Sequence, residues 1–407
     1  MNLIPGGITA AKGFRAGAIH AGVKSKKPDR LDLALIVSDV PCAAAGVYTR
    51  NLVKAAPVIL TREHLADGKA QGIVVNSGNA NACAPNARAH AERTAILAEE
   101  LTGIPAKDFI ISSTGVIGQE LNIASIEAAL PALVQSLDNT DIASDLAARA
   151  IMTTDTVKKE FAIEFTVGGK ICHMGVISKG SGMIHPNMGT TLTFMTTDCA
   201  ISSALLQKAL YDTVQVTMNR VSVDGDTSTN DTCCILANGL AENPEITAEN
   251  EEFTIFCAAL KALLTEVSRA IAADGEGATH LLTVTVKGAK DEKAAETLAK
   301  SIVCSSLTKA AIFGTDANWG RVLCAMGYSG AAFNPEKTDI FFASAAGEIL
   351  VCKDGTGIVF DEDKAKTILQ EHEVIILCDC KEGAAEATCW GCDLTYEYVK
   401  INGDYRT

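Results

Sequence analysis

The residues with the clearest potential for chemistry lie between Lys179 and Asp198, in the stretch KGSGMIHPNMGTTLTFMTTD. A glycine-rich turn and a proline lead there directly into a group of threonines. A threonine hydroxyl becomes a useful nucleophile only when a base lies beside it, and a free α-amino group on the same residue supplies such a base. The Gly189–Thr190 bond therefore has the features of a self-cleaving peptide bond, in which Thr190 would provide both groups.

Cleavage of this bond would start with attack of the Thr190 hydroxyl on the carbonyl of Gly189, and water would hydrolyse the resulting ester. Gly189 lacks a Cβ, so its backbone can adopt unusual dihedral angles, and Pro186 stiffens the approach. The released α-amino group would have a pKa of roughly 7.7–8.0, and could accept the hydroxyl proton. The same hydroxyl could then carry an acyl group between two substrates. A threonine-rich apolar run is more often an ordinary strand, and spacing alone does not separate the two interpretations.

The elements that must position this segment are predicted from the pattern of apolar residues. Apolar runs alternate with helical patterns, which indicates a mixed α/β fold. We expect strands at 33–37, 72–78 and 109–115, and helices at 86–102, 123–136, 140–151, 201–219, 247–273 and 289–302. The segment DGEGATH, 274–280, ends the longest helix and precedes the alternating run LLTVTV. We therefore expect a main catalytic domain over 1–279 and a smaller α/β domain over 280–407.

Composition narrows the class of protein. The chain has 407 residues, of which 48% are hydrophobic and 21% charged, and this predicts an extensive core. A net charge of -14 argues against nucleic acid or an anionic membrane as partner and favours small molecules. Neither a signal-peptide core nor an apolar run of about 18 residues is present, so we expect a cytoplasmic protein. Neither G-x-G-x-x-G nor a Walker A motif occurs.

The junction and several distant motifs resemble one known family. KGSGMIHPNMGTTL closely resembles the self-cleavage junction of the ornithine acetyltransferase family, also called glutamate N-acetyltransferase. The resemblance continues through TAAKGFRAG (9–17), VNSGNANAC (75–83), STGVIG (113–118), IMTTDT (151–156), SVDGDTSTND (222–231), DGEGATH (274–280), DANWGR (316–321) and WGCDLTYEYVKINGDYRT (390–407). The family commonly has alanine and methionine where this chain has Gly189 and Thr191, so Thr191 is the alternative residue for the cut.

The resemblance implies an activity and a set of site residues. The implied activity is acetyl transfer from N-acetylornithine to glutamate in arginine biosynthesis, with no cofactor. Some members also accept acetyl-CoA, and whether this chain does is left open. Thr190 is implied to be the self-cleavage residue and the acetyl carrier, with Thr114 and Gly115 stabilising the oxyanion. The implied substrate-contacting residues are Thr153 (with Thr154 as its alternative), Lys179, Thr190, Glu276, Asn402 and Thr407.

The resemblance also implies an architecture and an assembly. The implied fold is a layered sheet-and-helix sandwich of the self-processing N-terminal-threonine type. The precursor would be cut into chains of residues 1–189 and 190–407 that stay associated, with further pairing into a heterotetramer. A related alternative is an N-terminal-threonine amidase or aminopeptidase, because hydrolysis and transfer pass through the same acyl-enzyme.

A second alternative, from another class, is a non-catalytic protein that binds a metal or reacts through thiols. Cys378, Cys380, Cys389 and Cys392 have C-x-C and C-x-x-C spacing, which is compatible with zinc or redox chemistry. Cys378 lies in the buried-looking run VIILC, which argues against this interpretation.

Two further metal or acid–base candidates are weaker. SVDGDTSTND lacks the glycine at the sixth position and the acidic residue at the twelfth position of a calcium loop, so we expect a hydrogen-bonded loop without metal. His185 is expected to be solvated rather than a general base.

Overall fold

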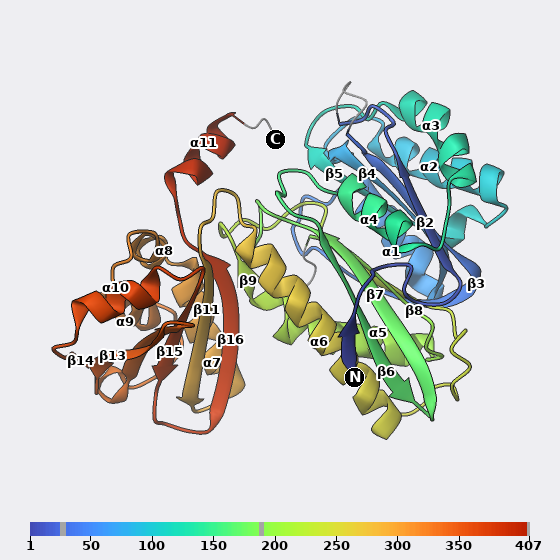
Figure 1. Cartoon of the computed structure of the whole chain (residues 1–407). Coiled ribbons are helices and arrows are strands. Elements are labelled where there is room, and N and C mark those ends of the chain that lie inside the picture. The colour runs from blue at the N-terminus through green and yellow to red at the C-terminus, as the bar shows by residue number, and fades with distance from the viewer. Residues whose placement is uncertain (25–29, 187–190, 405–407) are drawn as a thin grey trace.

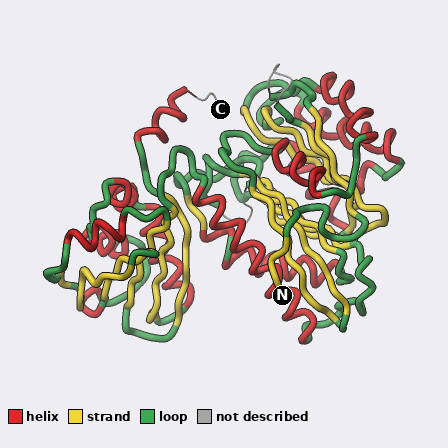
Figure 2. The backbone as a smooth tube through the Cα atoms, in the orientation of Figure 1, coloured by secondary structure: helices red, strands yellow, loops and turns green. Residues whose placement is uncertain are grey.

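Residues 1–24, 30–186 and 191–404 are described by the computed structural model, and they form two β-sheets with helices on their faces (Figures 1 and 2). Gly189, Thr190 and Thr407 lie outside the described residues. The two sheets lie beside each other, with α6 (Glu251–Ala273) between them (Figure 1).

The larger sheet has nine strands among the described residues, in the order β1-β6-β7-β8-β10-β3-β4-β5, with β2 paired to β3. β8 pairs in parallel with β10, and β4 with β5, whereas the other neighbours are antiparallel. The strands are β1 (Asn2–Ile4), β2 (Phe14–Ile19), β3 (Leu33–Tyr48), β4 (Lys69–Asn79), β5 (Phe109–Val116), β6 (Lys159–Val167), β7 (Lys170–Lys179), β8 (Leu192–Thr197) and β10 (Thr232–Ala237).

The long strand β3 allows this sheet to fold over on itself. Its pairing with β4 shifts register between Val37 and Cys42, and its second half pairs with β10. Side chains alternate between the faces of a strand. Ile36 from the first half and Phe194 and Leu236 from β8 and β10 meet in one buried cluster. The two halves therefore face each other as the inner layers of a sandwich, and α4 (Asp141–Ala150) packs into the same cluster.

Helices cover both outer faces of this sandwich. The outer face of β3, β4 and β5 carries α1 (Ala56–His64), α2 (Ala87–Thr102) and α3 (Ile123–Gln135). The outer face of β6, β7, β8 and β10 carries α5 (Ser203–Val216) and α6. α6 begins where the Asn250 side chain accepts a hydrogen bond from the backbone N–H of Phe253. Its apolar stripe packs on the sheet, where the rings of Phe256 and Phe165 meet edge to face with their centroids 6.0 Å apart.

The smaller sheet has seven strands among the described residues, in the order β14-β13-β12-β15-β11-β16-β9. These are β9 (Val221–Ser222), β11 (Leu281–Ala289), β12 (Asp339–Ser344), β13 (Gly347–Lys353), β14 (Thr356–Gly357), β15 (Glu373–Asp379) and β16 (Ala385–Cys392). Its apolar face packs against α7 (Glu292–Cys304), α8 (Ser306–Phe313), α9 (Trp319–Gly327) and α10 (Glu362–Leu369). The last helix, α11 (Tyr396–Asp404), leaves this sheet and extends towards the larger one (Figure 1).

The predicted mixed α/β class and layered sandwich are confirmed by these two sheets and their helices. Each of the six predicted helices occurs, and their ends differ from the expected ones by a few residues. The expected boundary between residues 279 and 280 falls in the connection from α6 to β11. However, β9 precedes that boundary and pairs with β16, so the division into two domains stays a prediction. No helix in the described part of the chain combines the length and apolar character needed to cross a membrane.

Candidate active site

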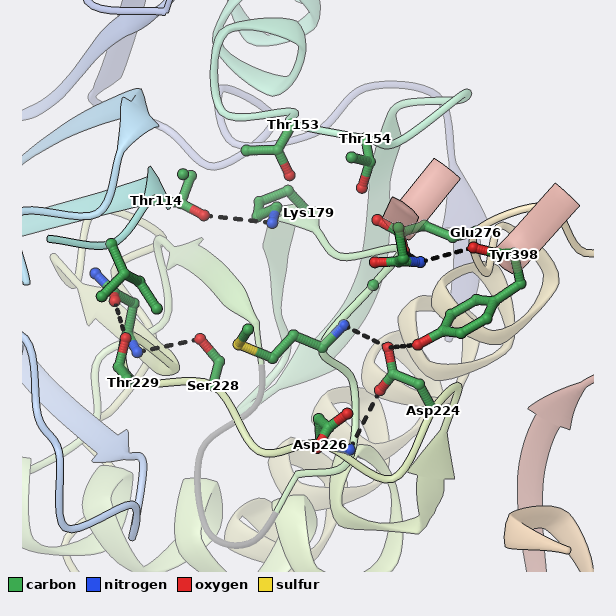
Figure 3. A pocket seen from close by; sticks show the side chains of 16 residues that line it. Thr114, Thr153, Thr154, Lys179, Asp224, Asp226, Ser228, Thr229, Glu276 and Tyr398 are labelled. Carbon is green, nitrogen blue, oxygen red and sulfur yellow. Dashed lines mark hydrogen bonds between the residues drawn. The ribbon is translucent and has the colours of Figure 1, made fainter. Parts of the chain in front are cut away.

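A cavity of about 260 Å³ lies where the loop after α6 and the C-terminal helix α11 meet the ends of β5 and β7 (Figure 3). Every predicted site residue in the described part of the chain lines it: Thr114, Gly115, Thr153, Lys179, Glu276 and Asn402. Thr154, the alternative to Thr153, lines it as well. The fold therefore gathers into one cavity residues that are far apart in sequence.

Thr114 and Gly115 stand at the end of β5, held by the neighbouring strand β4. Gly115 has a φ of +132°, and a Cβ there would lie 2.3 Å from the carbonyl carbon of Gly78. Only glycine fits, because both the backbone angle and the close approach of β4 exclude a side chain. Beside them, the Ser113 hydroxyl donates to Asn76 Oδ1 at 2.6 Å. The motif VNSGNANAC thus forms a support behind the two residues.

Lys179, at the end of β7, directs its ammonium group at Thr114. Its side chain is buried, and Nζ donates to Thr114 Oγ1 at 3.3 Å. Burial lowers the pKa of Lys179 below its ordinary value, while the carboxylates of Asp155 and Asp231 act in the opposite direction. The cavity therefore contains a cation that can donate hydrogen bonds and whose proton is held less tightly than that of an exposed lysine.

Asp155, Lys159 and Asp274 form a buried group, here called the ion cluster. Lys159 Nζ donates to Asp155 Oδ1 at 2.6 Å and also to Asp274, and the Lys159 side chain has no exposed surface. Asp155 further accepts from the backbone N–H groups of Gly180 at 2.7 Å and Thr153 at 2.9 Å. Burial alone would raise the pKa of Asp155, but the attraction of Lys159 and Lys179 lowers it below its ordinary value. The cluster ties together three loops that line the cavity.

Glu276 lies across the cavity from Thr114, and its carboxylate packs against Gly182. A Cβ on Gly182 would lie 2.3 Å from the carboxyl carbon of Glu276, so the glycine provides the space that this carboxylate occupies. Asn402 Nδ2 donates to Glu276 Oε2 at 2.7 Å, and the Tyr398 hydroxyl donates to Asp224 at 3.3 Å. Residues of α11 therefore close one side of the cavity (Figure 3).

The motif SVDGDTSTND forms a hydrogen-bonded loop, as expected, and it holds the described residues on both sides of the predicted cut. Before the cut, Asp224 accepts from the backbone N–H groups of Met183 at 2.6 Å and Ile184 at 2.9 Å. After the cut, Asp231 Oδ1 accepts from the N–H of Thr191 at 2.9 Å.

Thr191 is held in a strained conformation beside a small recess that adjoins the cavity. Its φ is +67°, which is costly for a β-branched residue, and its side chain is buried. The backbone N–H of Thr232 donates to the Thr191 carbonyl at 2.8 Å, so both backbone groups of Thr191 are fixed. Burial raises the pKa of Asp231 well above its ordinary value, although the Thr191 N–H acts in the opposite direction.

Comparison with known proteins identifies the family. The model of the ArgJ family matches residues 15–407. The chain belongs to the ArgJ family. The arginine biosynthesis bifunctional protein ArgJ of Symbiobacterium thermophilum is 48% identical over 408 residues, covering 100% of both chains. The protein of the same name from Caldanaerobacter subterraneus is 48% identical over 412 residues, again covering 100% of both.

One solved structure is that of ornithine acetyltransferase from Mycobacterium tuberculosis complexed with ornithine. It is 39% identical, covers 46% of this chain and 98% of the solved chain, and has a TM-score of 0.41. The family predicted from the sequence is confirmed by the family match and the full-length relatives, and so is the predicted class of enzyme, an acyltransferase of arginine biosynthesis. The roles of single residues in this ArgJ chain stay predictions.

Sequence reasoning missed the groups that position the lining residues. Asp155, Asp274 and Asp231 each stand inside a motif quoted for the resemblance to the ArgJ family, but no role was assigned to them. The available signal was a carboxylate next to a predicted site residue, as in Asp155 near Thr153 and Asp274 near Glu276. Lys159 gave no such signal, because a lysine in a strand is usually exposed.

The four C-terminal cysteines do not converge. Cys378 lies in β15 and Cys389 in β16, and β11 runs between these strands, so the two strands are about 9.5 Å apart. The two cysteines are also offset along β11, since Cys378 is opposite Val286 and Cys389 is opposite Val284. Burial raises the pKa of Cys389 to about 12 and that of Cys392 to about 11. No group of three or more metal-ligating side chains occurs among the described residues. These thiols pack as small apolar groups.

His185 was expected to be solvated, and this expectation is wrong. It is partly buried, with Nδ1 3.0 Å from the hydroxyl oxygen of Ser222, because the loop before the cut packs against β9. Burial lowers its pKa to about 4, so the ring is neutral at pH 7.

Proposed function

We propose that this enzyme transfers acetyl from N-acetylornithine to glutamate through an acetyl ester on Thr190, releasing ornithine and N-acetylglutamate. One observation carries the proposal. The predicted oxyanion residues, the predicted lysine and the predicted carboxylate line one cavity, and the recess beside it is lined by Thr191, the residue that follows Thr190. An acyl group on Thr190 would therefore lie close to all of them.

The first half-reaction would form the acetyl ester. Thr190 Oγ attacks the acetyl carbonyl carbon, and its proton passes to the α-amino group of the same residue. The negative charge that develops on the carbonyl oxygen is stabilised by the Thr114 hydroxyl and the backbone N–H of Gly115. The amide C–N bond then breaks, the proton moves to the departing nitrogen, and ornithine leaves. Glutamate reverses these steps, with its amine attacking the ester.

The charges of the cavity suit two amino-acid substrates. Lys179 can bind a substrate carboxylate, and Glu276 can bind the side-chain ammonium of ornithine. Asn402, which donates to Glu276, fixes the orientation of that carboxylate. Thr153 or Thr154, together with Thr407 from outside the described residues, would complete the contacts. The buried position of Lys179 and Glu276 strengthens these ionic interactions relative to those on the surface.

We further propose that the precursor cuts itself between Gly189 and Thr190. Asp224 and Asp231 hold the described residues on either side of this bond, and the strained Thr191 follows it. Strained backbone of this kind is concentrated at reactive sites. The products, residues 1–189 and 190–407, would remain packed together because β8 lies between β7 and β10 within one sheet.

The remaining proposals concern assembly and location. We propose that the two chains pair further into a heterotetramer, that 1–279 and 280–407 are its structural units, and that the enzyme works in the cytoplasm. Gel filtration with light scattering would measure the mass of the assembly against the 42.6 kDa of one copy.

The decisive experiment combines processing with turnover. Electrophoresis of the purified protein should give two fragments, each about half of 42.6 kDa, and sequencing of the second should start at Thr190. A start at Thr191 would move the nucleophile by one residue. The Thr190→Ala variant should stay uncut and inactive, and a variant that still matured and turned over would contradict the mechanism.

Assays with and without the acceptor, glutamate, distinguish acetyl transfer from hydrolysis. Incubation of the mature enzyme with N-acetylornithine alone should release at most one ornithine per site, because the acetyl group stays on Thr190, and added glutamate should restore turnover. Acetate release at full rate without glutamate would instead identify an amidase. Assays with glutamate and either N-acetylornithine or acetyl-CoA would then decide which donors the enzyme accepts.

A further inference from the structure

A second cavity, of about 600 Å³, lies at the end of β3 between α1 and α5. It shares no lining residue with the candidate active site. Its volume is in the range of small-molecule sites, roughly 300–1,000 Å³. Aromatic and aliphatic side chains form its walls, namely Tyr48 of β3, Val58 and Ile59 of α1, and Tyr211 of α5. Such walls suit a ligand with a flat apolar body.

The charged residues that line this second cavity are all positive. Arg50, Lys54 and Arg62 line it, on a chain whose net charge is -14. No ion pair joins any of the three to a carboxylate within the described ranges 1–24, 30–186 and 191–404. The nearest acidic residues in sequence, Glu63 on α1 and Asp212 on α5, pair instead with Arg88 and Lys208. Three cations remain available to a ligand.

This combination selects a class of ligand. Guanidinium groups bind phosphate oxygens in a bidentate way, and a lysine adds a point charge. A ligand with two or more phosphate charges and an aromatic ring would use both the cations and the walls. Nucleotides have this chemistry, either free or as the nucleotide end of a thioester carrier. The sequence has no known nucleotide-binding motif, so this site would be built differently.

The segment that follows β3 lines the second cavity and is also hydrogen-bonded to the loop 227–231 of the candidate active site. The Thr49 N–H donates to the Asp231 carbonyl at 3.0 Å, and the Thr49 hydroxyl donates to the Ser228 carbonyl at 2.7 Å. Asn51 Nδ2 donates to the Thr227 carbonyl at 2.9 Å. The segment that follows β3 is therefore bonded along the whole loop 227–231, whose Ser228, Thr229 and Asn230 line the candidate active site.

We propose that the second cavity is a binding site for a nucleotide-type polyanion, and that its occupancy stabilises the loop 227–231. A ligand held by Arg50 and Lys54 fixes the segment around Thr49 and Asn51, and this restricts the loop bonded to that segment. The site stands apart from the chemistry at Thr190, so its binding can be tested whether or not the proposed acetyl transfer is correct.

Calorimetric titration of the purified full chain tests the ligand class. The probes are ADP, inorganic pyrophosphate, adenosine and coenzyme A. ADP should bind at least about tenfold more tightly than pyrophosphate or adenosine, because only ADP uses both cations and walls. Tighter binding of coenzyme A than of ADP would assign the site to a thioester carrier, and the reverse to a free nucleotide. Binding of pyrophosphate as tightly as ADP, or no binding at millimolar ADP, would overturn the proposal.

Variants of the lining residues test whether ADP binds in the second cavity. The double variant Arg50→Gln/Arg62→Gln should lower the affinity for ADP at least about tenfold, since two charged contacts are lost. Both residues are exposed, so the fold should tolerate the changes. Lys170→Gln removes an exposed charge at the start of β7 and should leave the affinity unchanged. Equal affinity in the double variant and the parent would overturn the site assignment.

Hydrogen exchange tests the link between the two cavities without an activity assay. Saturating ADP should slow the exchange of backbone amides in 227–231 in the parent chain, and have no such effect in the double variant. Binding of ADP that leaves these amides unchanged would refute the link, because the bonded segment would then transmit nothing to the loop.

Discussion

Reactive side chains are buried in two parts of this molecule, and their surroundings differ in kind. Beside the candidate active site, Lys159 lies between Asp155 and Asp274, and hydrogen bonds lead from these carboxylates to the loops that line the cavity. In the smaller sheet, Cys378 and Cys389 face a layer of apolar side chains. A buried charge requires a partner, whereas a buried thiol requires only volume. The pattern of hydrogen bonds, more than the density of reactive residues, therefore distinguishes a site from a core.

Removal of the central charge of the ion cluster should have the largest effect. Lys159→Met leaves Asp155 and Asp274 buried with no cation between them, and breaking a buried pair in this way costs about 3–5 kcal/mol. We expect a fall of that size in the free energy of unfolding, measured with urea, and little or no mature enzyme.

The neighbouring lysine gives a matched control. Lys158 is 37% exposed and pairs with Asp145, which is 27% exposed, and with the largely buried Glu160. Lys158→Met should therefore cost less than Lys159→Met, because water reaches the Lys158 side chain and can solvate its partners in part. If both variants were destabilised equally, the ion cluster would have no special part in holding the cavity.

The next largest effect is expected from substitution of Asp231, which accepts a hydrogen bond from the strained Thr191. Asp231→Ala leaves the buried N–H of Thr191 without its acceptor, at a cost of about 1–3 kcal/mol. We expect slower conversion of precursor to the two fragments, followed by electrophoresis over time after synthesis.

The conservative substitution at the same position separates two roles. Asp231→Asn keeps a side-chain oxygen that can accept from Thr191, so a positioning role predicts nearly normal conversion. Conversion that fails in the Asn variant as well would indicate that the carboxyl group exchanges a proton during cleavage. Normal conversion in Asp231→Ala would exclude both roles.

The elements of this fold could be predicted because their patterns are local. Expected helix 247–273 corresponds to α6, whose apolar residues recur at helical spacing. β9 could not be predicted, because a two-residue strand has no pattern and its place is set by pairing with β16. The fold of the larger sheet about β3 likewise depends on contacts distant in sequence.

The site was predicted in part for a similar reason. Thr114, Lys179 and Glu276 were named through motifs, and they line one cavity. Lys159 was missed because a lysine in a strand is usually exposed, and because one of its two carboxylate partners, Asp274, is 115 residues away and is brought near only by folding. The roles of Gly189 and Thr190, which lie outside the described residues, rest on the chemistry of threonine and on the family.

A single methyl group should be enough to disturb the polar wall of the cavity. Gly182→Ala places a Cβ where the Glu276 carboxylate lies, so that carboxylate must move. We expect the KM for N-acetylornithine to rise about tenfold, which corresponds to the loss of one charged hydrogen bond, with a smaller change in kcat. Gly327→Ala in α9, where a Cβ meets open space, is the control and should leave KM unchanged. An unchanged KM in Gly182→Ala would argue against contact between Glu276 and substrate.

Substitutions of the buried cysteines in the smaller sheet should have much smaller effects than substitutions of the residues around the candidate active site. Cys378→Val and Cys389→Val replace buried thiols by apolar groups of similar size, so each should cost less than about 1.5 kcal/mol and leave the rate of transfer unchanged. Burial raises the pKa of Cys389 to about 12, so its reactive thiolate is scarce at pH 7 and increases with pH. Iodoacetamide should therefore label the exposed Cys83 and Cys324 first, as peptide mass spectrometry can measure. Rapid labelling of Cys389 at pH 7, or loss of activity in either valine variant, would show that this layer has a chemical role after all.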